Sequence, residues 1–104
     1  MSMVTKVLEI APQSVISPMP EQISSELNGE AVILNLTSGM YYGLNEVGAR
    51  IWELIQQPCS FEKLHGILVE EYDVQPDVCK QELQTLLLEL KQACLIEVQH
   101  ETAP

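Results

Sequence analysis

Hydrophobic and polar residues follow strand-like spacing in the first half of the chain. Ile23–Leu27 alternates apolar and polar positions, which predicts a strand with one solvent-exposed face. The Asn28-Gly29 pair predicts a two-residue hairpin turn, because both turn positions require positive φ. The return segment Ala31–Leu36 is apolar in both alternating sets of positions, which predicts a central strand covered on both faces. After a second turn at Thr37-Ser38-Gly39, Met40–Leu44 completes a predicted antiparallel meander.

The second half of the chain changes to helical spacing. Asn45 is a suitable N-cap for a first helix, which ends before Pro58. Ser60 can cap a second helix, and Pro76 suits the first turn of a third helix over 76–93. The pattern therefore predicts an α+β domain in which a three-stranded antiparallel sheet is followed by three helices.

The two ends of the chain lack such periodicity. Residues 1–20 contain three of the six prolines, which predicts an extended N-terminal arm with one short strand at Ser14–Ser17. We expect the ordered domain to occupy 21–98, with a short final strand or strap at Leu95–Val98, and 99–104 to form a tail.

Composition and charge narrow the possible functions. The chain has 104 residues, of which 46% are hydrophobic, and a net charge of −10, which is typical of one globular domain. This charge opposes nucleic-acid binding, which depends on Lys and Arg. The longest charge-free run, Ala31–Asn45, is too short and too polar to span a membrane, and no secretory pattern begins the chain. Three cysteines, an odd number, predict reduced thiols in the cytoplasm.

Residues that could support catalysis or metal binding are few. Cys59 and His65 are six positions apart, a spacing that does not by itself predict a nucleophile and base. Glu62 and His65 have the spacing of a di-iron motif, but the second copy that such a site needs is missing. Cys79 and Cys94 fall on a predicted apolar helix face, where small buried thiols are common. The sequence therefore predicts no enzyme, no cofactor and no metal.

The third predicted helix combines an apolar stripe with a basic flank. Its stripe consists of residues at helical spacing that are all apolar: Cys79, Leu83, Leu86, Leu87, Leu90, Ala93 and Cys94. Lys80, Gln84 and Lys91 lie beside Leu87 at the border of this stripe. Two of the five basic residues thus share one flank of one helix, a local reversal of sign in an acidic chain.

The third predicted strand is the exposed edge of the meander. Such an edge carries unpaired N–H and C=O groups and can accept a peptide as an extra strand. Tyr41 and Tyr42 lie on opposite faces as possible aromatic anchors, and Gly43 permits a close backbone approach. In the alternative, the tyrosines cap the core and the N-terminal arm covers the edge. The residues alone favour neither.

The segment from Gly39 to Leu54, GMYYGLNEVGARIWEL, resembles the PqqD-like family, also called RiPP precursor peptide recognition elements, where RiPP denotes a ribosomally made, post-translationally modified peptide. The similarity continues upstream through NGEAVILNL (28–36) and downstream through Tyr72-Asp73-Val74, and covers about residues 15–98. This chain departs from the family at Asn35, where members often have Asp, and at Cys94, where they often have Gly.

The resemblance implies a winged helix-turn-helix-like domain without catalytic activity. Such domains bind the leader segment of a precursor peptide and present it to a modifying enzyme, a radical SAM protein in pyrroloquinoline quinone synthesis or a transglutaminase-like cysteine peptidase in lasso peptide synthesis. The slightly favoured pathway here is the lasso type. The leader adds as a strand beside the third strand and packs on the third helix. Carried over, the peptide-binding residues are Met40, Tyr41, Tyr42, Gly43, Leu44, Lys80, Leu83, Gln84, Leu87 and Lys91.

Further expectations follow from this assignment. Acidic leader residues should pair with Lys80 and Lys91. Two other functions remain open: a winged-helix DNA-binding regulator, which the fold alone suggests, and a structural or oligomerisation module whose edge strand pairs with its own copy in a homodimer.

Overall fold

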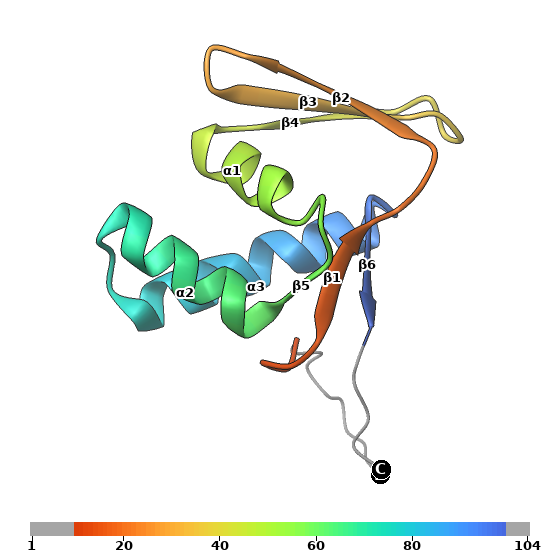
Figure 1. Ribbon diagram of the computed structural model, residues 1–104. Helices are drawn as coiled ribbons and strands as arrows, with labels where there is room; N and C mark the ends of the chain where they lie inside the picture. Colours follow the sequence, from red (N-terminus) through yellow and green to blue (C-terminus); the bar gives the residue numbers. More distant parts are fainter. Residues whose placement is uncertain (1–9, 100–104) are drawn as a thin grey trace, which may run out of the picture.

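The computed structural model describes residues 10–99, which form two small antiparallel sheets and three helices (Figure 1). In chain order the elements are β1 Val15–Pro18, β2 Gln22–Leu27, β3 Glu30–Asn35, β4 Tyr41–Leu44, α1 Glu46–Leu54, β5 Cys59–Ser60, α2 Phe61–Tyr72, α3 Pro76–Gln92 and β6 Ile96–Gln99. The β2-β3-β4 sheet lies above α1 in Figure 1, and α2 and α3 lie below it. The predicted α+β, winged helix-turn-helix-like arrangement is confirmed.

The turns of the meander form as their residues predict. Asn28 and Gly29 have φ values of +55° and +83°, the left-handed conformation that a tight hairpin turn requires. In the β3–β4 turn, the side-chain oxygen of Asn35 accepts hydrogen bonds from the backbone N–H groups of Thr37 and Ser38 at 2.9 and 3.1 Å. An Asp carboxylate could accept the same two bonds. The presence of Asn rather than Asp therefore leaves this turn unchanged.

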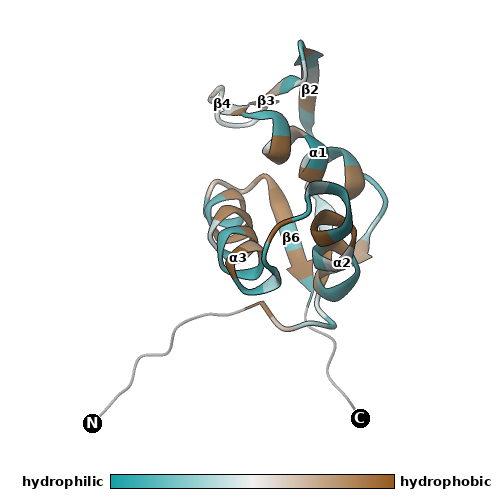
Figure 2. Ribbon diagram, turned by 90° about the vertical axis from the view of Figure 1, so that its left-hand side faces the viewer, coloured by the Kyte–Doolittle hydropathy of each residue, from teal (hydrophilic) through white to brown (hydrophobic). Residues whose placement is uncertain are grey.

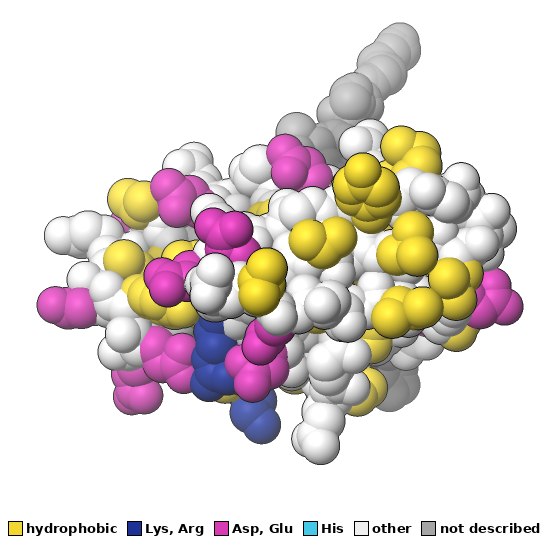
Figure 3. Space-filling view, turned by 90° about the horizontal axis from the view of Figure 1, so that it is seen from above, with side chains coloured by type: hydrophobic (Ala, Val, Ile, Leu, Met, Phe, Trp, Pro, Cys, Tyr) yellow, Lys and Arg dark blue, Asp and Glu magenta, His cyan; other side chains and the backbone are white. Residues whose placement is uncertain are grey.

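The β2-β3-β4 sheet buries one face and leaves the other open. Ala31 and Ile33 are almost fully buried, whereas Val32 between them is 47% exposed. The prediction that β3 is covered on both faces is therefore wrong, because the helices of the described residues pack against one face. Figure 3, seen from above, shows hydrophobic side chains on the open side. The exposed hydrophobic residues of this sheet include Ile23, Leu27, Val32 and Tyr41.

The helices begin at the predicted caps. The Asn45 side chain accepts a hydrogen bond from the Gly48 N–H at 2.9 Å at the start of α1. The Ser60 hydroxyl accepts one from the Lys63 N–H at 3.1 Å at the start of α2. Pro76 is the first residue of α3, where its missing N–H needs no partner. Local side-chain chemistry thus sets all three starting points.

The end of α3 has the backbone of a glycine cap with a cysteine in the glycine position. Cys94 has φ +63°, and its N–H donates to the Lys91 carbonyl at 3.0 Å. The Leu95 N–H donates to the Leu90 carbonyl at 2.9 Å, which completes a Schellman motif. The helix therefore ends as a Gly-capped helix would, with the added strain of a side chain in the left-handed conformation.

A second sheet joins segments from both ends of the chain. β1 pairs antiparallel with β5 on one side and with β6 on the other. Ile10 and Ile16 are 3% and 0% exposed and belong to the hydrophobic core. The predicted domain start at residue 21 is therefore wrong, because 10–20 contribute core side chains and a central strand. The rest of the predicted arm, 1–9, and tail residues 100–104 lie outside the described residues.

The hydrophobic core lies between the helices and the two sheets. Figure 2 shows hydrophobic stretches of the helices and of β6 facing the interior. Phe61, Leu64 and Leu87 from α2 and α3 are at most 2% exposed, as is Ile33 from the meander. Full burial of such a side chain contributes roughly 1.5–3 kcal/mol. This shared core fixes the meander relative to α3.

Candidate functional site

Within residues 10–99, the outer edge of β4 has no strand beside it. β4 pairs with β3 and forms one border of its sheet. The N-terminal arm was the segment expected as a possible cover, but its strand β1 pairs with β6 in the second sheet instead. The described structure therefore leaves this edge open to an added strand.

The register of β3 and β4 determines which backbone groups face outward. The Asn35 N–H donates to the Met40 carbonyl at 2.9 Å, so the backbone of Met40 is directed toward β3. Hydrogen-bonding direction alternates along an antiparallel pair, so the backbone of Tyr42 is also directed toward β3. The N–H and C=O groups of Tyr41 and Gly43 therefore point away from the sheet. They offer two donors and two acceptors to an incoming chain.

The predicted strand residues differ in what their side chains expose. Tyr41 is 72% exposed and Met40, just before the strand, is 55% exposed. Tyr42 is half-buried and packs against the core, which also contains Leu44. A Cβ atom placed on Gly43 would meet no heavy atom within 4 Å, so the sheet face over this residue is open. This strand thus combines exposed anchors with an accessible backbone.

An apolar groove of about 440 Å³ begins where β4 ends. Asn45, the residue after the strand, lies at its border. The lining comes from α1 and its N-cap (Asn45, Val47, Gly48, Ile51), from the end of α2 and the turn after it (Leu68, Tyr72, Val74), and from α3 (Val78, Cys79, Glu82, Leu83, Leu86). Val47, Val78 and Val74 are 40–51% exposed, so apolar surface is available to a ligand. The open edge and the groove meet at Asn45 and together form the candidate site.

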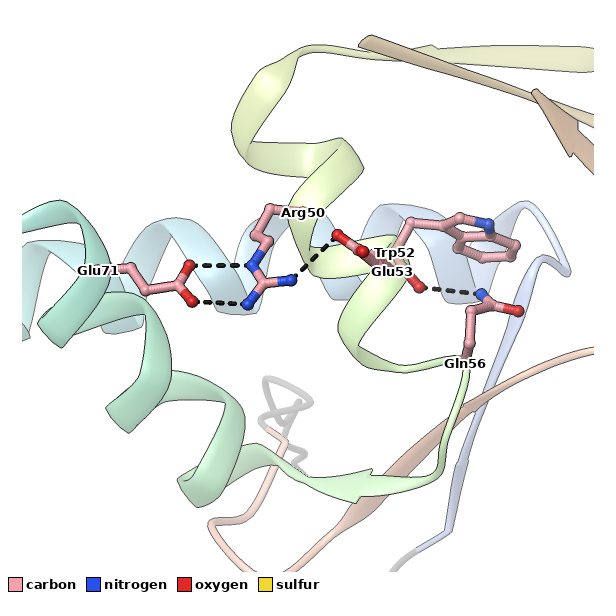
Figure 4. A network of polar contacts seen from close by, with 5 residues as sticks. All are labelled: Arg50, Trp52, Glu53, Gln56 and Glu71. Atoms are coloured by element: carbon pink, nitrogen blue, oxygen red, sulfur yellow. Dashed lines mark hydrogen bonds and ion pairs between the residues drawn. The ribbon is translucent and has the colours of Figure 1, made fainter. Parts of the chain in front are cut away.

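Two walls of the groove are joined by an ion pair between α1 and α2 (Figure 4). The guanidinium of Arg50 donates from Nε to Glu71 at 3.0 Å and from a terminal nitrogen to the same carboxylate at 2.6 Å. Its other terminal nitrogen donates to Glu53 at 3.0 Å. The hydrogen bonds from Arg50 hold the pKa of Glu71 below its usual value. This bidentate contact fixes α1 relative to the end of α2.

The basic flank of α3 does not face the groove. The side-chain amide of Gln84 accepts from the Ile10 N–H and donates to the Ile10 carbonyl, both at 2.9 Å, so the chain's own N-terminal segment occupies this side of the helix. Leu87 is fully buried and has no surface for a ligand. Lys80 and Lys91 lie on this flank and are absent from the groove lining. Of the predicted helix residues, the structure places Leu83 alone in the groove wall.

Sequence reasoning missed the side of α3 that does line the groove. Val78, Cys79, Glu82 and Leu86 lie on the opposite side of the buried stripe from the lysines. The 51% exposure of Val78 marks this side in the structure. In the sequence, Cys79 and Leu86 lie at the border of the apolar stripe that is farther from the lysines. This position was the one sequence feature that could have indicated the side of α3 that lines the groove.

The residues considered for catalysis have structural partners. The His65 Nε2 is 2.9 Å from the Pro76 carbonyl, and its ring stacks on Phe61. Burial raises the pKa of the Cys59 thiol, which disfavours the thiolate. No group of possible metal ligands occurs within residues 10–99, and no helix in that range is long and apolar enough to cross a membrane.

Comparison with known proteins identifies the family. The family model described as coenzyme PQQ synthesis protein D (PqqD) matches residues 30–96. The chain belongs to the PqqD family. This match includes β4, the groove and all of α3, so the candidate site lies within the PqqD domain. A search of curated proteins found no match.

Two solved structures share the PqqD fold seen here. TbiB1 in complex with the TbiA(beta) leader peptide is 28% identical, with a TM-score of 0.74 over 85% of this chain and 99% of that chain. A lasso peptide synthetase B1 complexed with the leader peptide is 23% identical, with a TM-score of 0.70 over 79% of this chain and 96% of that chain. Each alignment covers nearly the full length of the chain in the solved structure.

Proposed function

We propose that this PqqD-family protein is a non-catalytic chaperone that binds the leader segment of a ribosomally made precursor peptide. The leader adds as a strand along Met40–Leu44, and its next residues enter the groove between α1 and α3. The observation that carries this proposal is the β4 edge, which is unpaired within residues 10–99 and is followed by Asn45 at the border of an apolar groove. A peptide can gain backbone hydrogen bonds from the first and apolar burial from the second.

The leader peptide bound to TbiB1 supports this proposal, because that protein matches most of this chain at 28% identity. The groove also replaces the helix contact expected from the sequence. The leader would meet α3 through Val78, Glu82 and Leu86 rather than through the flank of Lys80 and Lys91.

The β4 edge and the groove can contribute to leader affinity on a similar scale. The outward groups of Tyr41 and Gly43 can form four hydrogen bonds at about 0.5–1.5 kcal/mol each. Each apolar side chain of the leader that becomes buried in the groove adds roughly 1.5–3 kcal/mol. Binding therefore needs both the backbone pairing and the apolar anchors, because ordering a disordered leader costs about 2–5 kcal/mol of the gross interaction.

The bound leader would then be presented to a modifying enzyme in the cytoplasm. The partner is a radical SAM protein in a PQQ-type pathway or a transglutaminase-like cysteine peptidase in a lasso-type pathway. Because TbiB1 is complexed with a leader peptide, we expect a gene for a precursor peptide beside the gene for this protein. The enzyme encoded with it distinguishes the two pathways.

The proposal is tested by calorimetric titration with the two halves of that precursor peptide. We expect the N-terminal half to bind with a micromolar dissociation constant and the C-terminal half to bind at least about 100-fold more weakly, since the leader contains the recognition segment. Equal affinity of the two halves, or binding of neither, would contradict the proposed function.

A further inference from the structure

The path offered to a peptide is lined by carboxylates at both ends. Glu82 is the single charged residue in the main groove among the described residues. Where this groove continues along α3, its lining adds Glu89. At the β4 end, a neighbouring hollow that shares Asn45 and Val47 with the groove is lined by Glu30 and Glu46. An apolar centre is therefore flanked by acidic side chains.

The basic residues of the described chain lie elsewhere. Arg50 is already paired with Glu53 and Glu71. Lys80 and Lys91 are on the flank of α3 whose Gln84 binds Ile10, and the positive charge of Lys63 acts near Cys59. No Lys or Arg of residues 10–99 lines the main groove or the hollows at its two ends. The negative potential of the path is therefore not neutralised locally.

We propose that the groove selects a cationic leader segment, in which an apolar or aromatic side chain enters the groove and Lys or Arg residues flank it. One cationic side chain faces Glu82 and Glu89, and the other faces Glu30 and Glu46. This inference rests on the proposed leader-binding function and adds the chemistry of the recognised segment. It reverses the expectation of an acidic leader, because that expectation placed the lysines of α3 beside the peptide.

A thiol within the groove supports this electrostatic assignment. Cys79 lies in the wall beside Glu82. Burial and the negative charge of Glu82 both raise the pKa of the Cys79 thiol. The carboxylate therefore acts on the interior of the groove as well as on its border.

The effect of the carboxylates on binding should be moderate and salt-dependent. Exposed ion pairs contribute about 0.2–1 kcal/mol each, so two pairs at one end correspond to about a 2- to 30-fold change in affinity. Charge complementarity acts strongly on association rates, and about 1 M salt reduces the screening length to about 3 Å. The contribution of the carboxylates to the affinity and association rate of a cationic leader should therefore disappear at high salt.

The test compares two double variants that change the net charge equally. Glu82→Gln with Glu89→Gln removes the carboxylates at the α3 end of the path, whereas Glu62→Gln with Glu97→Gln removes two that do not line it. The leader half of the precursor peptide is the ligand, with stopped-flow fluorescence at low and high salt. We expect the first variant to bind about 3- to 10-fold more weakly at low salt, with slower association. The second should remain within about 2-fold of wild type.

The outcomes separate this inference from the proposed function. Leader binding that is unaffected or strengthened by loss of Glu82 and Glu89 overturns the cationic assignment and leaves the chaperone function standing. An equal loss in both double variants also overturns it, because the effect would then come from net charge alone. Failure of the leader to bind wild-type protein overturns both.

A second measurement needs no leader. With Cys59→Ser and Cys94→Gly, Cys79 is the remaining thiol. Its reaction rates with a trimethylammonium methanethiosulfonate and with a sulfonate methanethiosulfonate report the local potential. We expect the cationic reagent to react faster, with a rate ratio that falls about 2- to 5-fold after Glu82→Gln and stays unchanged after Glu97→Gln. A ratio at or below the one measured for a free small-molecule thiol contradicts an acidic groove.

Discussion

Proline at Gly43 provides a direct test of the β4 edge. The Gly43 N–H points away from β3, so its loss leaves the β3–β4 ladder intact. Proline is tolerated in an edge strand where the N–H faces outward. The proline side chain also has space, because no heavy atom lies within 4 Å of a Cβ placed on Gly43. Gly43→Pro should therefore fold and lose one donor for the incoming strand.

The expected loss follows from the hydrogen bond and from steric exclusion. Removing one donor leaves a leader carbonyl without its partner, which costs about 1–3 kcal/mol when that carbonyl is buried. The proline ring also occupies the position where the leader backbone would approach Gly43. Together these effects predict about a 10- to 150-fold increase in the dissociation constant.

Two matched variants isolate the lost donor. Gly43→Ala keeps the N–H and should bind the leader within about 3-fold of wild type, because its methyl group enters open space. Ser24→Pro places the same ring on β2, at the opposite border of the sheet. Its N–H also faces outward, because the two-residue turn makes Leu27 and Glu30 a hydrogen-bonded pair and the direction alternates from there. This variant should not change leader affinity.

Anisotropy titration with the labelled leader half, after circular dichroism has shown that each variant is folded, gives the four dissociation constants. Wild-type affinity in folded Gly43→Pro would refute strand addition at β4. Equal losses in Gly43→Pro and Ser24→Pro would also refute it, since the effect would not depend on the edge. By contrast, Tyr42→Pro would break a bond to β3 and mainly lower stability, so it cannot serve as this test.

Three further predictions concern stability. Cys94→Gly should increase the free energy of unfolding in urea by about 0.5–1 kcal/mol, because φ is +63° and relief of side-chain strain exceeds the added chain entropy; no increase would contradict a strained cap. Asn45→Ala should lower it by about 1 kcal/mol and Asn45→Asp much less, since an Asp carboxylate can accept the Gly48 hydrogen bond; equal losses would contradict the cap. Arg50 depresses the pKa of Glu71, so the contribution of this carboxylate to stability is present above its ordinary pKa and decreases as the pH falls through the lower folded-state value. Urea unfolding from pH 6 to pH 3 should show a shallower loss for Glu71→Gln, and an identical profile would refute this coupling.

Much of the local structure was predictable from short segments. The Asn28-Gly29 turn, the Asn45 and Ser60 caps and the start of α3 at Pro76 all follow from contacts within about four residues. Such features depend on φ preference and on nearby hydrogen bonds, which neighbouring residues determine. The order of strands and helices, and the position of the edge strand, follow from these features.

Distant contacts decided the boundary of the domain and the covered faces. β1 is central in its sheet because β5 and β6, far along the chain, reach it from both sides. The pattern of residues 10–20 could not predict those pairing partners, because each strand is short and its pairing is determined by tertiary packing. The open face of β3 likewise depends on where the helices pack rather than on its own residues.

The side of α3 that lines the groove shows the same division. Helical spacing by itself determined that Lys80, Gln84 and Lys91 share one side of the helix and that Cys79 and Leu86 lie toward another. It could not determine what stands against each side, because that depends on segments far away in sequence. The tertiary structure placed Ile10 against Gln84 and the start of α1 opposite Glu82. The direction of each side chain on a helix is determined locally, whereas the residues that it contacts are determined by the packing of the whole core.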